Sequence, residues 1–572
     1  MKGVIAKLIF EALEEEKVEV TKEEIEILLE APPNQEMGDF ALPCFLFAKR
    51  MKMPPDEVAL IVRQNIGTHS KEFEDIQTAG PYVNFFVDRK TLALRLIFDI
   101  KKQKGKYGGL DRKQKVKPKT MVEFPSPNTN KPLHLGHLRN MSIGESVSRI
   151  LEFNGEKVYR ANLNNDRGIH ICKSMTGYEK LSKKMKNKTP QSAKVKSDHF
   201  VGDFYVKFNK KAAENPDWEV AAHRMLRNWE SGDKKTMELW KKMNKWALDG
   251  FQKTYKRFGI KHDVTYFESD FYKEGKEMVM EGVKKGIFQK RKDGAIVADL
   301  KKEKLDEKVL LRIDGTSVYI TQDLHLAKLK FDKYKLNKSI YVVGNEQNYH
   351  FKVLFSLLKK LGFKEEMYHL SYGMVELPEG KMKSREGTVV DADNILDEVQ
   401  NLAKKELKKR LKLSETELER RSLTISLAAI RYLLLKVDTK KNMLFDPKES
   451  ISFEGDTGPY ILYTYARASS ILRKLKKEME VEYWEGLDKK EIELVKKLSE
   501  FKQLSEKAYT ELNPTIIANY AYQLAQTFNE FYHECPVIGS NKEHFRVSLV
   551  EVFRQVLKNA LNLIGIDTLE EM

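Results

Sequence analysis

The chain has 572 residues and carries 101 Lys and Arg against 84 Asp and Glu, which gives a net charge of +17. Its three cysteines are too few and too widely spaced for a disulfide framework or a zinc knuckle. No apolar run approaches the roughly 18 residues of a membrane span, and the amphipathic N-terminus is not a signal peptide, so we expect a soluble, cytoplasmic protein. The positive charge fits a polyanionic partner, although a lysine-rich proteome also produces basic proteins.

The first section of the chain, residues 1–115, ends in the stretch KKQKGKYGGLDRKQKVKPK, which is typical of a linker. It contains the segments NQEMGDFALPCFLFAKRMKMPP and AGPYVNFFV. The second segment reads as an alternating strand that carries Asn84 and Phe86. An aromatic side chain on such a strand belongs to the core more often than to a binding surface.

The most informative stretch runs from Glu123 to Asn140 and reads EFPSPNTNKPLHLGHLRN. It follows a short apolar strand, Met121–Phe124, and opens a helix whose apolar residues recur at helical spacing. A second strand follows over Lys157–Leu163, and strand–loop–helix–strand is one half of a doubly wound nucleotide-binding sheet. Phosphate binds where a helix begins, because unpaired amides and the helix dipole meet there. The two histidines of HLGH lie at this helix start and could bind phosphate. The alternative interpretation is that they only cap the helix.

After this half, the chain predicts a polar, mostly helical insertion over about residues 173–270. A second half then resumes near Phe271 and contains the buried strand SIYVVG. It ends in a lysine-rich signature, KMKSREGTVV, over Lys381–Val390. The pattern beyond Asp391 is helical almost throughout. We therefore expect three domains, residues 1–115, 116–395 and 396–572.

The HLGH stretch and the lysine signature together resemble the paired motifs of class I aminoacyl-tRNA synthetases. The sequence around HLGH resembles the arginyl-tRNA synthetase family in particular. There a strand ends in Glu and is followed by SPN and then by Lys-Pro. The resemblance implies an α/β fold: a Rossmann-type doubly wound parallel sheet, an α+β N-terminal domain that contacts the tRNA D-loop, and an all-α anticodon-binding domain. It also implies that Asn84 and Phe86 face RNA.

The function implied by this resemblance is the ATP-dependent activation of L-arginine and its transfer to the 3′ end of tRNA(Arg). The family generally needs tRNA for the activation step. We expect ATP to bind with Mg²⁺, as phosphate chemistry generally requires. From the cysteine spacing and the lack of long apolar runs we expect no structural zinc and no membrane partner, and we expect a monomeric enzyme. Two alternatives stay open, a non-catalytic tRNA-binding relative and a sibling class I synthetase for another amino acid.

By the same resemblance, His134 and His137 hold the phosphates of ATP and act in catalysis, while Gly136 faces adenine. The lysine signature departs from the usual pattern, because Lys stands at its third position and its second lysine is missing. Many arginyl-tRNA synthetases carry a lysine just upstream of HxGH instead, where Lys131 lies. The expected ATP contacts from these two segments are Lys131, Lys381, Met382, Lys383 and Arg385, of which Lys131 and Lys381 are also expected to be catalytic.

Selection of arginine needs acids matched to a planar cation, since a carboxylate can accept two parallel hydrogen bonds from a guanidinium. The resemblance implies that Glu123 and Asp323 bind the guanidinium and that the hydroxyl of Tyr319 adds a further contact. It places Ser126, Asn128 and Gln347 around the rest of the amino acid. A wrong amino acid would leave a buried acid without its partner, and this free-energy cost discriminates strongly against it. No second, hydrolytic site is then needed, so we expect no editing domain.

Polar and glycine positions at the end of the second strand also match the family, namely Asn162, Asp166 and Gly168, whereas Arg167 and His170 differ from its commoner bacterial sequence. In the helical C-terminal part, aromatic residues alternate with arginine, and one or two of them are expected to stack on anticodon bases. We name Tyr463 and Arg467 as tRNA contacts. Most of the other aromatics at helical spacing must be core.

Overall fold

The computed structural model describes residues 1–30, 32–34, 37–67, 72–110, 116–182, 188–272, 274–376, 390–475 and 486–572. These residues form two compact units, each with a hydrophobic core of its own. The first unit comprises residues 1–104, 477–499 and 530–552. The second comprises residues 105–476, 500–529 and 553–572. The boundaries of the three domains expected from the sequence stay a prediction.

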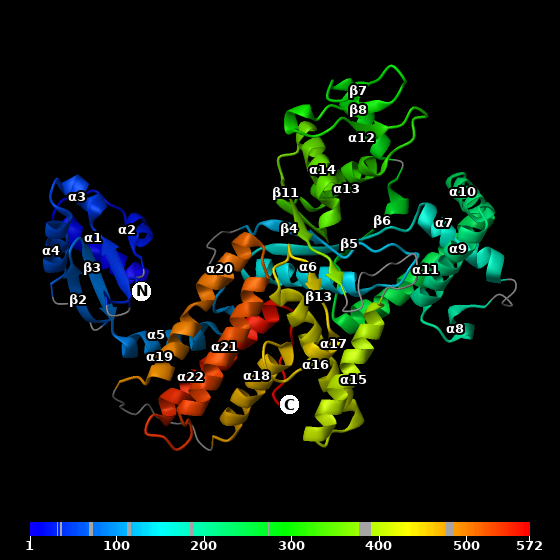
Figure 1. Ribbon diagram of the computed structural model, residues 1–572. Coiled ribbons are helices and arrows are strands. Elements are labelled where there is room, and N and C mark those ends of the chain that lie inside the picture. Colours follow the sequence, from blue (N-terminus) through cyan, green and yellow to red (C-terminus); the bar gives the residue numbers. More distant parts are fainter. Residues whose placement is uncertain are drawn as a thin grey trace. The chain divides into compact units, whose positions relative to one another are not determined.

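The N-terminal part of the first unit combines a three-stranded antiparallel sheet, in the order β1-β3-β2, with helices (Figure 1). The strand expected around Phe86 is β3. Capping side chains fix two helix starts, since Thr21 forms a capping box with Glu24 and Asp88 accepts from the amide of Thr91. The elements are α1 (Lys2–Glu14), α2 (Lys22–Leu28), β1 (Phe40–Pro43), α3 (Phe45–Met51), α4 (Pro55–Ile66), β2 (Phe73–Ala79), β3 (Tyr82–Val87) and α5 (Arg89–Gln103).

The second unit is built on a parallel sheet of five strands in the order β11-β10-β4-β5-β6. The chain starts in the middle at β4, moves outward to β6, and resumes on the other side of β4 at β10. This confirms the doubly wound parallel sheet, and it puts the switch point, where such folds bind ligands, between β4 and β10. The strands are β4 (Lys119–Glu123), β5 (Lys157–Asn164), β6 (Val264–Phe267), β10 (Lys338–Gly344) and β11 (Glu366–Tyr372).

Helix α6 (Leu135–Phe153) follows β4, as the sequence predicts, and packs against β5 and β10. Small residues allow it to approach closely: a Cβ on Gly144 would lie 2.4 Å from Cγ of Phe124. Its buried Arg139 donates to main-chain oxygens of two distant segments, at 2.8 Å to Gly373 and 2.9 Å to Lys441. The helix is therefore fixed on several sides at once.

Between β5 and β6 the chain is helical (Figure 1), in the region where the sequence predicts an insertion, and the bounds of that insertion stay a prediction. Its helices share a core rich in aromatic side chains, including Tyr178, Phe200 and Trp246. Between β6 and β10 the chain also forms a small antiparallel sheet that the sequence did not indicate. The elements from β5 to β11 are α7 (Ile169–Ser182), α8 (Pro190–Ala193), α9 (Ser197–Glu214), α10 (Asp217–Glu230), α11 (Lys234–Phe258), η4 (Glu268–Asp270), α12 (Gly275–Lys284), β7 (Gln289–Lys290), β8 (Ile296–Ala298), η5 (Lys301–Glu303), β9 (Lys308–Leu311), α13 (Tyr319–Tyr334), η6 (Asn345–Gln347) and α14 (Asn348–Lys360).

The C-terminal part is helical, as expected, apart from a short parallel pairing of β12 (Val375–Glu376) with β13 (Met443–Leu444). Within the described residues, no helix has the length and apolar character needed to cross a bilayer. The three cysteines are buried free thiols. The helices are α15 (Ala392–Arg410), α16 (Glu415–Lys436), α17 (Pro447–Ser450), α18 (Gly458–Arg473), α19 (Lys489–Ser499), α20 (Phe501–Glu511), α21 (Thr515–Glu534) and α22 (Glu543–Leu563).

Candidate active site

The two histidines of HLGH form a reciprocal cap at the start of α6. Nδ1 of His134 accepts a hydrogen bond from the amide of Gly136 at 3.1 Å, and Nδ1 of His137 accepts one from the amide of His134 at 3.0 Å. The ring centroids lie 4.0 Å apart. The capping alternative is thus present in the structure, but it uses only one nitrogen of each ring.

This cap fixes the chemistry of the remaining nitrogens. A backbone amide only donates, so each Nδ1 is unprotonated and each neutral ring carries its proton on Nε2. Burial, followed by the charge of Lys131, lowers the pKa of His134 to about 3. Burial and the neighbouring His134 and Lys131 lower the pKa of His137 well below its usual value. The pair therefore offers two neutral Nε2–H donors at a helix N-terminus.

Lys131 lies three residues before this cap and is partly buried. Burial lowers the pKa of its ammonium group. Its charge acts on both imidazoles, as their lowered pKa values show. The structure therefore brings the upstream lysine expected from the sequence into the same site as the histidines.

The segment that carries the lysine signature is anchored beside this site at its C-terminal end. The amide of Leu135 donates to the oxygen of Val390 at 3.2 Å, and the amide of Ala392 donates to that of Leu133 at 2.9 Å. On the N-terminal side, Arg139 holds the main chain at Gly373. The predicted ATP contacts of this segment, Lys381, Met382, Lys383 and Arg385, lie outside the described residues.

A cavity of about 420 Å³ opens at the carboxyl ends of the central strands. Nε2 of His350 and Oδ2 of Asp323 lie 2.7 Å apart on its wall, so a histidine from α14 orients the acid from α13. A cavity with a carboxylate and amide side chains suits a small molecule that carries both a cation and polar groups. Four predicted arginine-binding residues line it together: Asn128, Tyr319, Asp323 and Gln347.

The other two predicted arginine-binding residues do not line this cavity. Glu123 is buried at the end of β4, where its carboxylate is ion-paired with the fully buried Lys330 of α13. Burial opposes the charge of Lys330, but the attraction of Glu123, Tyr341 and Asp323, together with the hydrogen bond to Glu123, outweighs burial and raises the pKa of the lysine. Ser126 is half-buried with a positive φ of 55°, and its amide donates to Asn162 at 3.2 Å.

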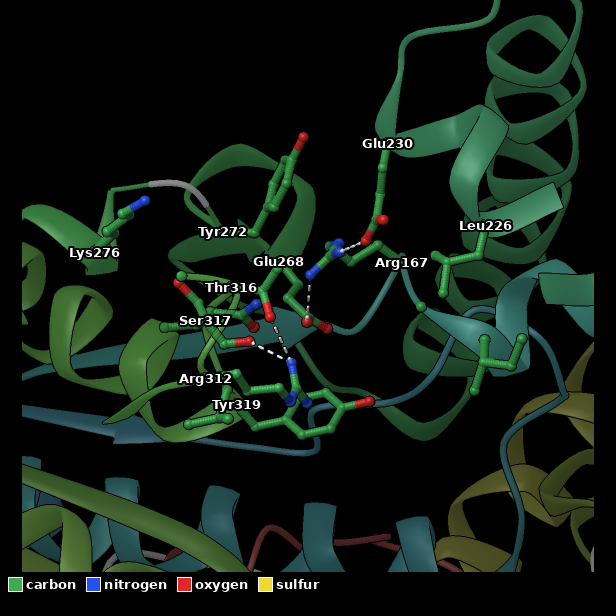
Figure 2. Close-up of a pocket in the computed structure, with 15 residues that line it drawn as sticks. Arg167, Leu226, Glu230, Glu268, Tyr272, Lys276, Arg312, Thr316, Ser317 and Tyr319 are labelled. Atoms are coloured by element: carbon green, nitrogen blue, oxygen red, sulfur yellow. Dashed lines mark hydrogen bonds and ion pairs between the residues drawn. The ribbon is translucent and has the colours of Figure 1, made fainter. Parts of the chain in front are cut away.

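A larger cavity of about 670 Å³, drawn in Figure 2, adjoins the first. The two cavities share several lining residues. The shared wall is polar and contains Arg167, Glu268 and Gln322, with Tyr319, which is 68% exposed. Sequence reasoning missed Glu268, although it directly follows the parallel strand β6, where ligand-binding residues gather. It also missed Lys330, since a lysine within a helix gives no sign of burial.

The polar positions that follow β5 support this wall. Asp166 is 3% exposed and accepts from Ser269, at 2.9 Å from its amide and 2.7 Å from its hydroxyl. Gly168 has a φ of +102°, a conformation that favours glycine, and lines both cavities. These residues join the ends of β5 and β6 into one surface.

One acidic group near the site has the composition of a metal site, namely Asp198, His199 and Asp393. The ammonium of Lys196 lies 2.8 Å from a carboxylate oxygen of Asp198 and 2.8 Å from one of Asp393. A lysine therefore already supplies the positive charge that these acids need.

The residues predicted to contact tRNA differ in exposure. Asn84 is only 4% exposed within β3, whereas Phe86 is half-buried. In α18, the guanidinium of Arg467 lies 5.1 Å from the ring centroid of Tyr463, and both residues are partly exposed. The nearby Tyr465, Tyr520 and Phe528 are core residues, as expected for most aromatics there.

Profiles of known protein families match three consecutive parts of the chain. The profile of the class I (R) tRNA synthetase catalytic domain matches residues 97–447, that of the arginyl-tRNA synthetase N-terminal domain matches 3–87, and that of the DALR anticodon-binding domain matches 461–572. The arginine–tRNA ligase of Treponema denticola is 45% identical over 96% of this chain and 95% of its own. The chain belongs to the arginyl-tRNA synthetase family.

Further relatives of this arginyl-tRNA synthetase agree with that assignment. The arginine–tRNA ligase of Borrelia duttonii is 42% identical over 100% of this chain and 99% of its own. The solved arginyl-tRNA synthetase of Thermus thermophilus superposes with a TM-score of 0.80 at 25% identity, with full coverage of both chains. This synthetase is therefore a class I arginine–tRNA ligase with an N-terminal domain, a parallel-sheet catalytic domain and a helical anticodon-binding domain.

Proposed function

We propose that the cavity of about 420 Å³ binds L-arginine. Asp323, oriented by His350, accepts hydrogen bonds from the guanidinium, and the Tyr319 hydroxyl adds a further contact. Asn128 and Gln347 hold the α-amino and carboxylate groups. Glu123 stays a predicted guanidinium ligand that would have to share its carboxylate with Lys330, and Ser126 stays a predicted contact.

We further propose that ATP lies at the start of α6, with its α-phosphate on the Nε2–H groups of His134 and His137 and its adenine against Gly136. Two neutral Nε2–H donors at a helix N-terminus support this role. Lys131 supplies positive charge for the phosphates. Lys381, Lys383 and Arg385 add further positive charge there, and Met382 also contacts ATP. Mg²⁺ would come with ATP.

In the first step, a carboxylate oxygen of arginine attacks the α-phosphorus, the bond to pyrophosphate breaks, and arginyl-adenylate forms. In the second, a terminal ribose hydroxyl of tRNA(Arg) attacks the adenylate carbonyl and releases AMP. Donors fixed in advance around the phosphate stabilise the negative charge of the first transition state. We expect the first step to need bound tRNA, and the enzyme to act as a cytoplasmic monomer. Phe86, Tyr463 and Arg467 remain proposed RNA contacts, with Asn84 less accessible.

The lining of the cavity by Asp323 carries this proposal, and pyrophosphate exchange tests it. With tRNA(Arg) present, the wild type should exchange pyrophosphate into ATP with arginine. Asp323→Asn should raise the KM for arginine about 10- to 100-fold, because a charged hydrogen bond to the guanidinium is lost. Asp332→Asn, the same change on the outer face of α13, should leave that KM unchanged. Exchange with another amino acid instead of arginine would refute the substrate assignment.

A further inference from the structure

Arg167 lies in the wall between the two cavities and joins four parts of the second unit (Figure 2). It follows β5, and its guanidinium lies 4.3 Å from the ring centroid of Tyr272 and 5.3 Å from that of Trp229. One nitrogen is 3.1 Å from Oε1 of Glu230, at the end of α10 in the insertion. Another is 3.7 Å from Oε1 of Glu268, which follows β6.

The amide of Gln322 completes this arrangement from α13. Oriented so that donors face acceptors, its nitrogen donates to Oε1 of Glu268 at 2.8 Å and its oxygen accepts from Arg167 at 3.0 Å. The side chains of Arg167 and Glu268 are only 11% and 9% exposed. Stacking, ion pairing and the amide bridge together hold the guanidinium in one place, which a flexible ammonium could not reproduce.

Glu268 lines the proposed arginine cavity as well as the larger one. Its carboxylate is close to two further acids, Asp166 and Asp323, and Arg167 is the cation that opposes them. Burial, with these acids, raises the pKa of Glu268 to about 7, and Arg167 acts in the opposite direction. A carboxylate in this position would be costly without either Arg167 or a bound cation.

We propose that Glu268 is a second acid that binds the cationic substrate arginine, and that Arg167 is the positioning residue that aims Glu268 at the cavity and favours its ionised form. The inference rests on the proposed function of the cavity. Arginine carries two positive groups, so a site with Asp323 on one wall and Glu268 on another matches its charge distribution. Because Arg167 is also held by Glu230, the insertion contributes to the geometry of the amino-acid site.

The pH dependence of kcat/KM for arginine tests the proposal. Only the ionised Glu268 attracts a cation, so in the wild type this parameter should rise with pH through about 7. Glu268→Gln should remove that rise and increase the KM for arginine at least about tenfold at pH 8, with the KM for ATP unchanged. The Gln variant separates the titration of Glu268 from that of its neighbours. The other charged or titratable groups around Glu268 that face the two cavities or act on its charge are Asp166, Arg167, His170, Glu230, Lys276, Arg312, Asp323 and His350.

Replacement of Arg167 separates positioning from folding. Arg167→Met should shift the rise of kcat/KM by about one pH unit upward, so that the KM for arginine is raised at pH 7 and recovers near pH 9. Arg167→Lys should restore part of the loss, because it keeps the charge but not the stacking. Arg291→Met and Glu281→Gln, on the surface, should change none of these values. Thermal unfolding of each variant shows whether it is folded.

An unchanged KM for arginine in Glu268→Gln, or an unshifted pH profile in folded Arg167→Met, would overturn the proposal. Glu268→Gln keeps the test decisive even if the Met variant does not fold, because glutamine preserves the shape of the side chain. Failure of the proposed function would look different, since the wild type itself would then show no exchange with arginine.

Discussion

At the residue scale, each of the two histidines uses Nδ1 to cap the helix start and offers its Nε2–H to the substrate. Nδ1 of His134 caps α6, and its Nε2–H is the proposed phosphate donor. Asparagine places an acceptor near Nδ1, whereas glutamine reaches the position of Nε2. His134→Asn should therefore keep the melting temperature but lower kcat about 10²- to 10³-fold. His134→Gln should cost about 1 kcal/mol of stability through loss of the cap. Equal stability and equal activity in the two variants would contradict this division.

The buried pair of Glu123 and Lys330 gives a second prediction at this scale. Lys330 also lies 4.8 Å from the ring centroid of Tyr341, so little water reaches the charges. Lys330→Met should lower the free energy of unfolding by about 3–5 kcal/mol, because it leaves a buried carboxylate without its counterion. Adding Glu123→Gln should recover part of that loss, and denaturant unfolding of the three variants measures it. Additive losses in the double variant would argue against a coupled pair.

At the element scale, the close approach of α6 to the end of β4 depends on Gly144. A Cβ there would lie 2.4 Å from Phe124, which is fully buried. Gly144→Ala should therefore cost about 1–3 kcal/mol by overpacking, although alanine is the better helix former. Gly105→Ala, where a Cβ meets nothing within 4 Å, is the matched control. Thermal unfolding compares the two, and a Gly144→Ala variant at least as stable as the control would show that this contact is not tight.

The elements also show what a sequence can and cannot indicate. Strands β4 and β5 and helix α6 were predictable because their periodicity and the HLGH motif are local. The strands β7 to β9, two to four residues each, carry too short a pattern to be recognised. The pairing of Glu123 with Lys330 joins residues 207 positions apart, and that of Arg167 with Glu268 depends on how β5 and β6 lie side by side. Such contacts arise only when the sheet is assembled.

At the scale of the whole molecule, the net charge of +17 is expected to matter for a polyanionic substrate. Binding of tRNA to Lys and Arg releases condensed counterions, so its affinity should fall linearly with salt concentration on logarithmic axes. We expect the KM for tRNA to rise at least about tenfold between 50 and 200 mM salt. The KM for arginine, measured at saturating tRNA, should change much less. Equal salt dependence of the two would speak against an electrostatic tRNA interface.

In the proposed enzyme, one sheet edge combines an arginine pocket at Asp323 with a phosphate site at His134 and His137. The most direct measurement is aminoacylation of unfractionated tRNA by the purified full-length protein, with each standard amino acid in turn. We predict that arginine alone is attached, in an ATP-dependent reaction that is slowed about 10²- to 10³-fold in His134→Asn. Attachment of a different amino acid, or undiminished arginylation by that variant, would contradict the account.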